Sequence, residues 1–153
     1  MIIEKLYKEG RFQEAIDYST RSYKINSASN ARYNAKLEID TAGVTYMKNG
    51  KITMDIGPEA FTRPTKGLGL FDASRLPGTL YHEGVHVDQF SSGVVSFDPI
   101  SRSGVEAQAY LRTLQNATEL DLSSAVKDYY NMRYLTESSR TNSVFDYSFA
   151  EMN

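Results

Sequence analysis

Both histidines of the 153-residue chain lie within one five-residue window, His82-Glu83-Gly84-Val85-His86. Residues four apart on an α-helix differ by about 40° in direction, so a helix here would make His82 and His86 project side by side. Two imidazoles one helical turn apart can bind a single zinc ion, at about 2.0–2.1 Å each. The spacing therefore predicts a helix that carries a metal site, around which the rest of the chain must fold.

Glu83 is the residue of this window that we expect to move a proton. On a helix it is rotated by about 100° from His82 and by about 60° from His86, so it lies beside the metal and does not point at it. A carboxylate there can accept a proton from metal-activated water, which is the general-base role of this motif. The alternative is a surface helix with two solvated histidines that have no functional role.

The third metal ligand has to be a carboxylate. A catalytic zinc site usually has three protein ligands, and the chain has neither a third histidine nor a cysteine. Glu106 follows His86 by 20 residues, at the start of a predicted helix, and is the favoured candidate. Asp98, in the loop before Pro99, is the alternative, whereas Asp88 lies too near on the same helix and faces away.

Small residues predict that the two helices of the site approach each other closely. Ala107 and Ala109 follow Glu106 on the predicted second helix, and Gly84 lies between the two histidines on the first. Glycine within a helix costs about 1 kcal/mol relative to alanine, so its presence suggests close backbone contact. We expect Gly84 to serve the same helix–helix approach.

The succession of patterns along the chain predicts one α+β domain over residues 1–153. Apolar residues at helical spacing predict a helical hairpin over residues 1–30, broken at Gly10. Residues 76–138 are predicted to form the metal-site helices, namely the histidine helix ending near Gly93, a second over 102–118 and a third over 123–138.

A β-hairpin is predicted over residues 36–57, between the two helical regions. Apolar and polar residues alternate on both sides of Asn49-Gly50. This dipeptide is a strong hairpin signal because both turn residues need positive φ. The apolar residues of the second strand, Lys51–Ile56, are expected to share one face.

Composition excludes several classes of function. Apolar residues make up 41% and charged residues 24% of the chain, which is an ordinary globular mixture and predicts a folded protein. The net charge of -2 offers no basic surface for nucleic acid or for an anionic membrane. No segment approaches the roughly 18 apolar residues of a membrane span, and the first residues do not resemble a cleaved leader, so we expect a soluble chain.

The motif and the helix after it resemble those of the gluzincin metallopeptidases. The resemblance rests on His82-Glu83-x-x-His86 followed by Glu106-Ala107, since gluzincins take their third zinc ligand from a glutamate on the second helix. It implies a zincin-like fold and zinc-dependent peptide hydrolysis. Gluzincins often carry an aspartate that orients a metal-binding histidine at the position where this chain has Tyr110, so the resemblance does not assign that role here. The metzincin class is excluded, because Gln89 and Ser92 replace its glycine and histidine.

The longer string Thr79–Gln89, after a strand-like Ile52-Thr53-Met54, is similar to small peptidase toxin domains. Such domains stand at the C-termini of bacterial polymorphic toxins, including proteins with RHS repeats. This resemblance covers about residues 44–112. It implies a toxin or effector peptidase that acts on a protein or peptide, an immunity protein as partner, and secretion or delivery as part of a larger protein.

Other residues are expected to support the chemistry. Gln89 lies within about 20° of His82 around the helix and either hydrogen-bonds a ligand or is simply a polar helix-end residue. Peptide hydrolysis also needs a donor to the oxyanion. Tyr110 and Tyr130 are the favoured candidates for this donor, and Tyr129, Tyr134 and Arg112 are the others considered.

The strand Lys51–Ile56 has two possible uses. In zincin folds an edge strand above the metal pairs with the extended substrate backbone, and this strand is the candidate for that position. The alternative is an internal strand that only supports the core.

These residues together predict hydrolysis of peptide bonds by metal-activated water, with Zn²⁺ held by His82, His86 and Glu106 and with Glu83 as the base. The alternative from another class is a non-catalytic metal-binding or protein-interaction module with a degenerate zincin site. A bound metal with an open position for water favours the enzyme, and a fourth protein ligand favours the module.

Overall fold

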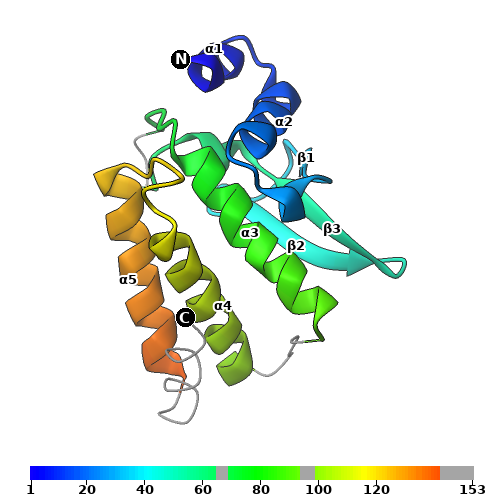
Figure 1. Cartoon of the computed structure of the whole chain (residues 1–153), viewed down its shortest axis with the longest axis vertical. Helices are drawn as coiled ribbons and strands as arrows, with labels where there is room; N and C mark the ends of the chain where they lie inside the picture. Colours follow the sequence, from blue (N-terminus) through cyan, green and yellow to red (C-terminus); the bar gives the residue numbers. More distant parts are fainter. Residues whose placement is uncertain (65–68, 94–98, 142–153) are drawn as a thin grey trace.

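The structure is a computed structural model that describes residues 1–64, 69–93 and 99–141. Helices and a three-stranded sheet form the α+β fold that the sequence predicts (Figure 1). In chain order the elements are α1 (Ile2–Lys8), α2 (Phe12–Ser22), the 3₁₀ turn η1 (Asn26–Ala28), β1 (Arg32–Tyr33), β2 (Gly43–Lys48), β3 (Lys51–Ile56), the 3₁₀ turn η2 (Pro58–Phe61), α3 (Arg75–Ser91), α4 (Pro99–Gln115) and α5 (Ser124–Arg140).

The two N-terminal helices form the predicted helical hairpin. The chain turns between them at Gly10, whose φ of 73° is readily accessible to glycine. Aromatic side chains attach this hairpin to the rest of the molecule: the ring of Tyr7 lies 5.4 Å from that of Phe61, and the ring of Phe12 lies 4.6 Å from that of Tyr33. Phe61 is fully buried, so this contact belongs to the core.

The predicted β-hairpin is present around Asn49-Gly50. Both turn residues have positive φ, 52° and 76°, and the pairing places Lys48 opposite Lys51. Met54 and Ile56 of β3 are buried on the core side, as the alternation predicts.

The hairpin begins later than the predicted range 36–57, because strand β2 starts only at Gly43. The segment before it turns: the Asn34 side chain accepts a hydrogen bond from the backbone N–H of Lys36 at 2.9 Å, and the N–H of Leu37 bonds to the Asn34 carbonyl. An asparagine that binds its own downstream backbone favours a turn over a strand. Ile39, which continued the alternating pattern, is 78% exposed.

The strand order is β1-β3-β2, so Lys51–Ile56 is the central strand of the sheet. The prediction that this strand lies at an edge is wrong, and the alternative of an internal strand holds. The reason is β1, a two-residue strand that pairs parallel with the end of β3, placing Arg32 opposite Asp55. Within the described residues, β2 is the six-residue strand that has a neighbour on one side only.

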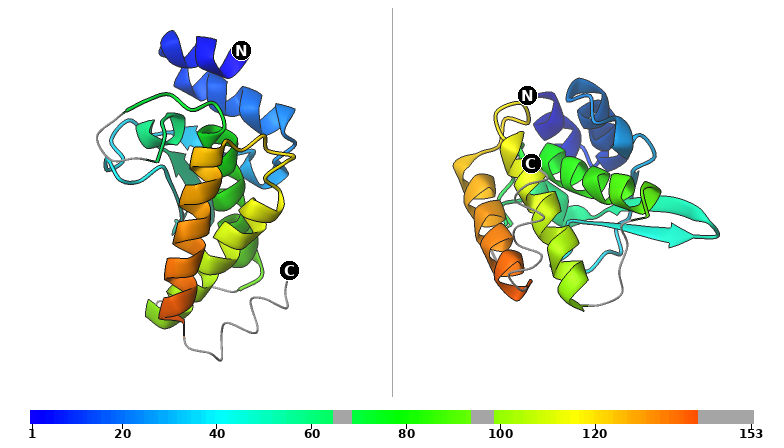
Figure 2. Two further views of the ribbon diagram at one scale, coloured as in Figure 1. Left: turned by 90° about the vertical axis from the view of Figure 1, so that its left-hand side faces the viewer. Right: turned by 60° about the horizontal axis from the view of Figure 1, so that its bottom comes forward.

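Helix α3 is the centre of the molecule, between the sheet on one side and α4 on the other (Figure 2). Eleven of its 17 residues are buried. Helix α4 runs back along α3, and α5 runs back along α4 (Figure 1). The serine that begins α5 caps it: Ser123 Oγ accepts a hydrogen bond from the Val126 N–H at 3.3 Å. This arrangement positions one face of α3 opposite α4 and another opposite β2.

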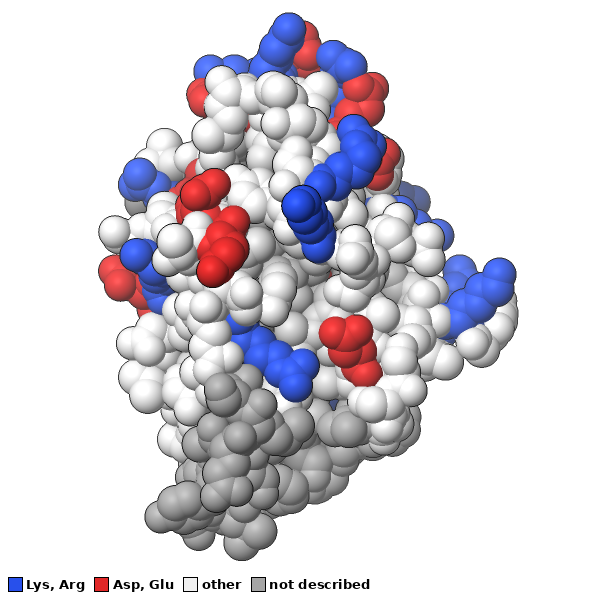
Figure 3. All heavy atoms as spheres, in the orientation of Figure 1, with Lys and Arg blue, Asp and Glu red and all other residues white. Residues whose placement is uncertain are grey.

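Acidic and basic side chains are interspersed on the face of the molecule seen in Figure 3, in keeping with the small net charge. None of the helices within the described ranges has both the length and the apolar character that crossing a membrane requires.

Candidate metal centre

Helix α3 brings the two histidines together. Their Nε2 atoms lie 3.2 Å apart, and the two rings are almost perpendicular, with centroids 4.9 Å apart. His82 is buried, and its ring packs against Tyr110 at 4.4 Å. The spacing of one helical turn therefore produces two imidazole nitrogens that point at one place.

Glu106 enters the same place from α4. Its Oε1 contacts His86 Nε2 closely and lies 3.7 Å from His82 Nε2. One ligand atom from each residue can be chosen so that all three lie within 4.8 Å of one another, which makes this a group that could hold a metal ion. Of the alternatives, Asp98 lies outside the described residues, and Asp88 on α3 is not part of the group.

The donor set fits a small tetrahedral cation. Ligand atoms at 2.0–2.1 Å from a tetrahedral zinc ion are separated by roughly 3.3 Å, close to the 3.2 Å between the two imidazole nitrogens. Two imidazoles and a carboxylate suit zinc and also other first-row metals, so the donor set does not by itself identify the metal.

Gln89 determines which nitrogen of His86 is free to bind. Its Nε2 donates to Gln108 Oε1 at 2.8 Å and to the Val105 carbonyl at 3.1 Å, so its Oε1 faces His86 Nδ1 at 2.7 Å. Nδ1 must then carry the hydrogen, which leaves the lone pair of His86 Nε2 directed at the Glu106 carboxylate. Two acceptors facing each other require a proton or a cation between them. Gln89 therefore hydrogen-bonds the candidate ligand His86, which is one of its two predicted roles.

The opposite charges of His86 and Glu106 stabilise each other, so a metal would replace the proton that lies between them. Burial by itself lowers the pKa of His86, but the neighbouring Glu106 carboxylate outweighs it and raises this pKa to about 9. Burial by itself raises the pKa of Glu106, but the hydrogen bonds and charges of His82 and His86 hold this pKa well below its usual range. The carboxylate is thus ionised at neutral pH, the form that binds a metal.

Glu83 lies beside the group and is held by a residue of the sheet. It is buried, and the Thr45 hydroxyl of β2 donates to its Oε1 at 2.8 Å. Its other oxygen, Oε2, lies 4.0 Å from His82 Nε2. One carboxylate oxygen is therefore fixed by β2 while the other faces the space between the histidines and the cavity.

Gly43 allows this close approach of strand and helix. A β-carbon at Gly43 would lie 2.9 Å from Glu83 Cγ, closer than real β-carbons approach a neighbour, and 3.0 Å from Thr79 Cγ2, which would have to shift. No sequence pattern points to Thr45 or Gly43, because their role depends on which strand packs against α3.

Gly84 serves a different contact from the one predicted. A β-carbon there would collide with the Ser27 hydroxyl in η1 and would lie 3.4 Å from Ser27 Cβ. Gly84 is rotated by about 200° from His82 around the helix, so it faces away from the metal group and from α4. The glycine lets α3 approach η1, and the prediction of an α3–α4 approach through Gly84 is wrong.

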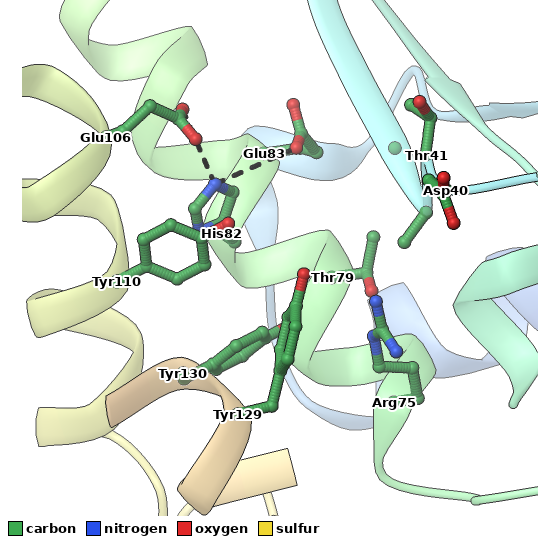
Figure 4. A pocket seen from close by; sticks show the side chains of 12 residues that line it. Asp40, Thr41, Arg75, Thr79, His82, Glu83, Glu106, Tyr110, Tyr129 and Tyr130 are labelled. Carbon is green, nitrogen blue, oxygen red and sulfur yellow. Dashed lines mark ion pairs between the residues drawn. The ribbon is translucent and has the colours of Figure 1, made fainter. Parts of the chain in front are cut away.

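A cavity of about 130 Å³ opens beside His82 and Glu83. Figure 4 shows side chains from α3, α4 and α5 around it, with the segment before β2 on the opposite side. Arg75, Thr79 and Tyr129 line it in addition to the predicted site residues. Arg75 is a residue that sequence reasoning missed, since nothing in the motif points two turns upstream of His82.

The structure brings both favoured tyrosines to this cavity. The Tyr110 ring lies 4.4 Å from the His82 ring, and the Tyr130 ring lies 6.2 Å from it. Burial raises the pKa of both phenols, so both remain protonated donors. Tyr129 also lines the cavity, and Figure 4 shows its side chain extending from α5 toward α3. The other two predicted donors, Tyr134 and Arg112, are not among its lining residues.

His82 has no second polar contact of the kind that Gln89 gives His86. Its Nδ1 is buried and has no hydrogen-bond partner within the described part of the chain. Packing against the Tyr110 ring orients His82 instead.

The chain was compared with models of protein families, with curated proteins and with solved structures, and no match to any of the three was found.

Proposed function

We propose that this protein is a zinc-dependent peptidase with a zincin-like, gluzincin-type site. The observation that carries the proposal is the convergence of His82, His86 and Glu106 from two helices, with the Glu83 carboxylate beside them. Such a set of three ligands leaves a fourth position of a tetrahedral ion for water or substrate. A buried carboxylate that stands next to the ligands without joining them suits a general base.

Zinc bound by these groups would supply a Lewis acid that polarises a carbonyl and lowers the pKa of water. The residues of the chain account for the proton transfers. Glu83 accepts the proton of the attacking water and later delivers it to the leaving amine. Thr45 keeps the carboxylate aimed during both transfers, because it occupies only one of the two oxygens.

Tyr110 and Tyr130 are the proposed donors to the oxyanion that forms on the substrate carbonyl. Both phenols line the cavity that also contains His82 and Glu83. Their pKa values are raised, so neither phenol loses its hydrogen near neutral pH.

Strand β2 is the part of the sheet that suits an extended substrate. It is an edge strand in the described sheet, and its first residue, Gly43, lines the cavity next to Glu83. Backbone groups at such an edge can pair with a peptide without selecting particular side chains. We propose that β2 takes the role first predicted for Lys51–Ile56.

The experiment that tests the function compares zinc-loaded wild type with Glu83→Gln on a quenched fluorescent peptide library. The variant should keep its zinc and lose about 10²–10⁴ in turnover, because the base is gone and the ligands are intact. Glu119→Gln, which changes an exposed carboxylate in the turn after α4, is the matched control. Full activity of Glu83→Gln would defeat the assignment, and purified protein without any metal would favour the interaction module.

The resemblance to toxin domains leads to a proposal about biological role. A peptidase of this kind would act as a toxin or effector, and an immunity protein would cover the cavity beside His82. Expression of the wild type in a bacterial cytoplasm should slow growth, whereas Glu83→Gln should be tolerated. Equal harmlessness of the two forms would contradict the toxin role and leave the peptidase chemistry standing.

A further inference from the structure

Arg75 is a buried cation in the wall of the candidate active site. It is the first residue of α3 and is only 5% exposed. It precedes His82 by seven residues, which is within about 20° of two full turns, so both side chains leave the same face of the helix. Both line the same cavity, and Figure 4 shows the Arg75 guanidinium directed into it.

The guanidinium of Arg75 has no carboxylate partner within the described residues. Arg32, Arg133 and Arg140 each pair with an acidic side chain, whereas Arg75 forms no ion pair. One of its terminal nitrogens donates to the Thr62 carbonyl at 3.2 Å, and its Nε is buried without a hydrogen-bond partner. The Tyr129 ring lies 5.1 Å from the guanidinium carbon, which compensates part of the charge by a cation–π contact.

A buried guanidinium without a carboxylate partner favours an anionic ligand. Removing an ion from water is costly unless a counter-charge and hydrogen bonds replace the lost hydration. The planar fork of an arginine matches a carboxylate with two parallel hydrogen bonds. A ligand carboxylate in the cavity would supply what the chain itself does not.

The acidic residues of the cavity do not fill this role. Glu83 is held by Thr45, and Glu106 contacts His86. Asp40 also lines the cavity, but it is exposed and forms no ion pair with Arg75. Solvent therefore screens the charge of Asp40 more effectively than that of the buried guanidinium.

We propose that Arg75 binds a substrate carboxylate, so that this site selects peptides with a negative charge close to the scissile bond. The inference rests on the proposed peptidase function and names its substrate class. Seven helical residues span about 10 Å, and an extended peptide advances about 3.4 Å per residue. The carboxylate is thus expected within about three residues of the scissile bond, either as an acidic side chain or as the end of the peptide chain.

Four acetylated peptides separate these two sources of the carboxylate. The first is a tetra-alanine with a free C-terminus, and the second is its C-terminal amide. The third is Ala-Ala-Glu-Ala amide, and the fourth is Ala-Ala-Gln-Ala amide. Binding is measured by calorimetry in the zinc-loaded Glu83→Gln protein, where turnover cannot disturb the titration. One charged peptide should bind roughly tenfold to hundredfold more tightly than its neutral counterpart.

The same titrations with Arg75→Met and Arg75→Lys assign the effect to the arginine. The preference should disappear in Arg75→Met and fall about tenfold in Arg75→Lys, which keeps a charge but not the fork. Arg63→Met, which removes an exposed arginine, should behave as the parent. A preference that survives in Arg75→Met would show that the metal binds the carboxylate, and it would overturn the proposal.

A second variant keeps the proposal testable if Arg75→Met does not fold. Asp40→Asn removes an exposed negative charge from the same cavity and should strengthen binding of the charged peptide about twofold to threefold. No change in Asp40→Asn together with no preference in the parent would overturn the Arg75 assignment.

The turnover of the wild type on the four peptides distinguishes this failure from failure of the proposed function. Equal hydrolysis of charged and neutral peptides would reject the role of Arg75 and leave the peptidase standing. Hydrolysis of none of them, nor of the peptide library, would reject the peptidase itself.

Discussion

The hydroxyl of Thr45 lies 2.8 Å from Oε1 of Glu83, although the two residues are 38 positions apart in the sequence. The contact joins the edge strand β2 to α3, the helix of the candidate metal site, and Gly43 makes room for it. It gives the two oxygens of Glu83 different surroundings, since Oε2 faces His82. A strand that is remote from the motif in the sequence thus orients the proposed base.

Thr45→Val is expected to lower kcat about tenfold and to leave zinc binding and KM nearly unchanged. Valine keeps the shape of threonine but removes the hydrogen bond to the Glu83 carboxylate, and loss of one such bond accounts for that factor. Steady-state hydrolysis of a fluorescent peptide measures it. Thr53→Val is the control, because Thr53 pairs with Tyr46 and lies on the opposite face of the hairpin. An unchanged kcat in Thr45→Val would remove Thr45 from the account.

Gln89→Leu is expected to weaken zinc binding about tenfold to hundredfold. The variant removes the acceptor that holds His86 Nδ1–H and so releases the ring orientation and the tautomer. It also removes the links to Gln108 and Val105 on α4, for which we expect a loss of about 1–3 kcal/mol in the free energy of unfolding. Competition with a chromophoric chelator measures the affinity of the folded protein.

Gln115→Leu is the matched control for that experiment, because Gln115 is exposed at the end of α4. Its zinc affinity should equal that of the wild type. If Gln89→Leu bound zinc as tightly as this control, the hydrogen bond to His86 would have no part in the metal site.

The free energy of unfolding should decrease as the pH falls below about 4, in part because of Asp55. Burial by itself raises the pKa of Asp55, but hydrogen bonds from Arg32, Asn34 and Tyr46 outweigh it and lower this pKa. A carboxylate whose pKa is lower in the folded than in the unfolded protein stabilises the fold at pH values above its ordinary pKa. This stabilisation is lost as the pH falls through the folded-state pKa. Asp55→Asn should therefore cost about 1–3 kcal/mol at neutral pH and less in acid.

Urea unfolding at neutral pH and near pH 3 measures this difference. Asp17→Asn provides the control, because Asp17 is an exposed carboxylate on α2. An equal loss of stability in Asp55→Asn at both pH values would contradict the role assigned to its ionised carboxylate.

The helices could be predicted from the sequence because their signals are local. Gly10 breaks the N-terminal helices, Ser123 caps α5 and the histidine spacing fits only a helical face. His82 and His86 follow from the same local reasoning. Elimination requires only some carboxylate as the third ligand, and the gluzincin resemblance favours Glu106 over Asp98; the structure brings Glu106 to the two histidines.

The sheet could not be predicted in the same way, because pairing depends on contacts between distant segments. Strand β1 has only two residues, too few for an alternating pattern, yet its pairing makes Lys51–Ile56 the central strand. The roles of Thr45 and Arg75 depend in turn on what packs around α3, so neither has a signature in the sequence. Gly84 illustrates the same limit: the glycine indicated a close contact, but only the fold identified Ser27 as its neighbour.

Zinc titration of metal-free wild type and of Glu106→Gln, with X-ray absorption at the zinc edge, tests the central claim most directly. We predict one zinc per chain, with two imidazole nitrogens at about 2.0–2.1 Å and one carboxylate oxygen. Glu106→Gln should bind zinc at least about tenfold more weakly, because it loses a charged ligand. Failure of the wild type to bind stoichiometric zinc, or equal affinity in Glu106→Gln, would contradict the account.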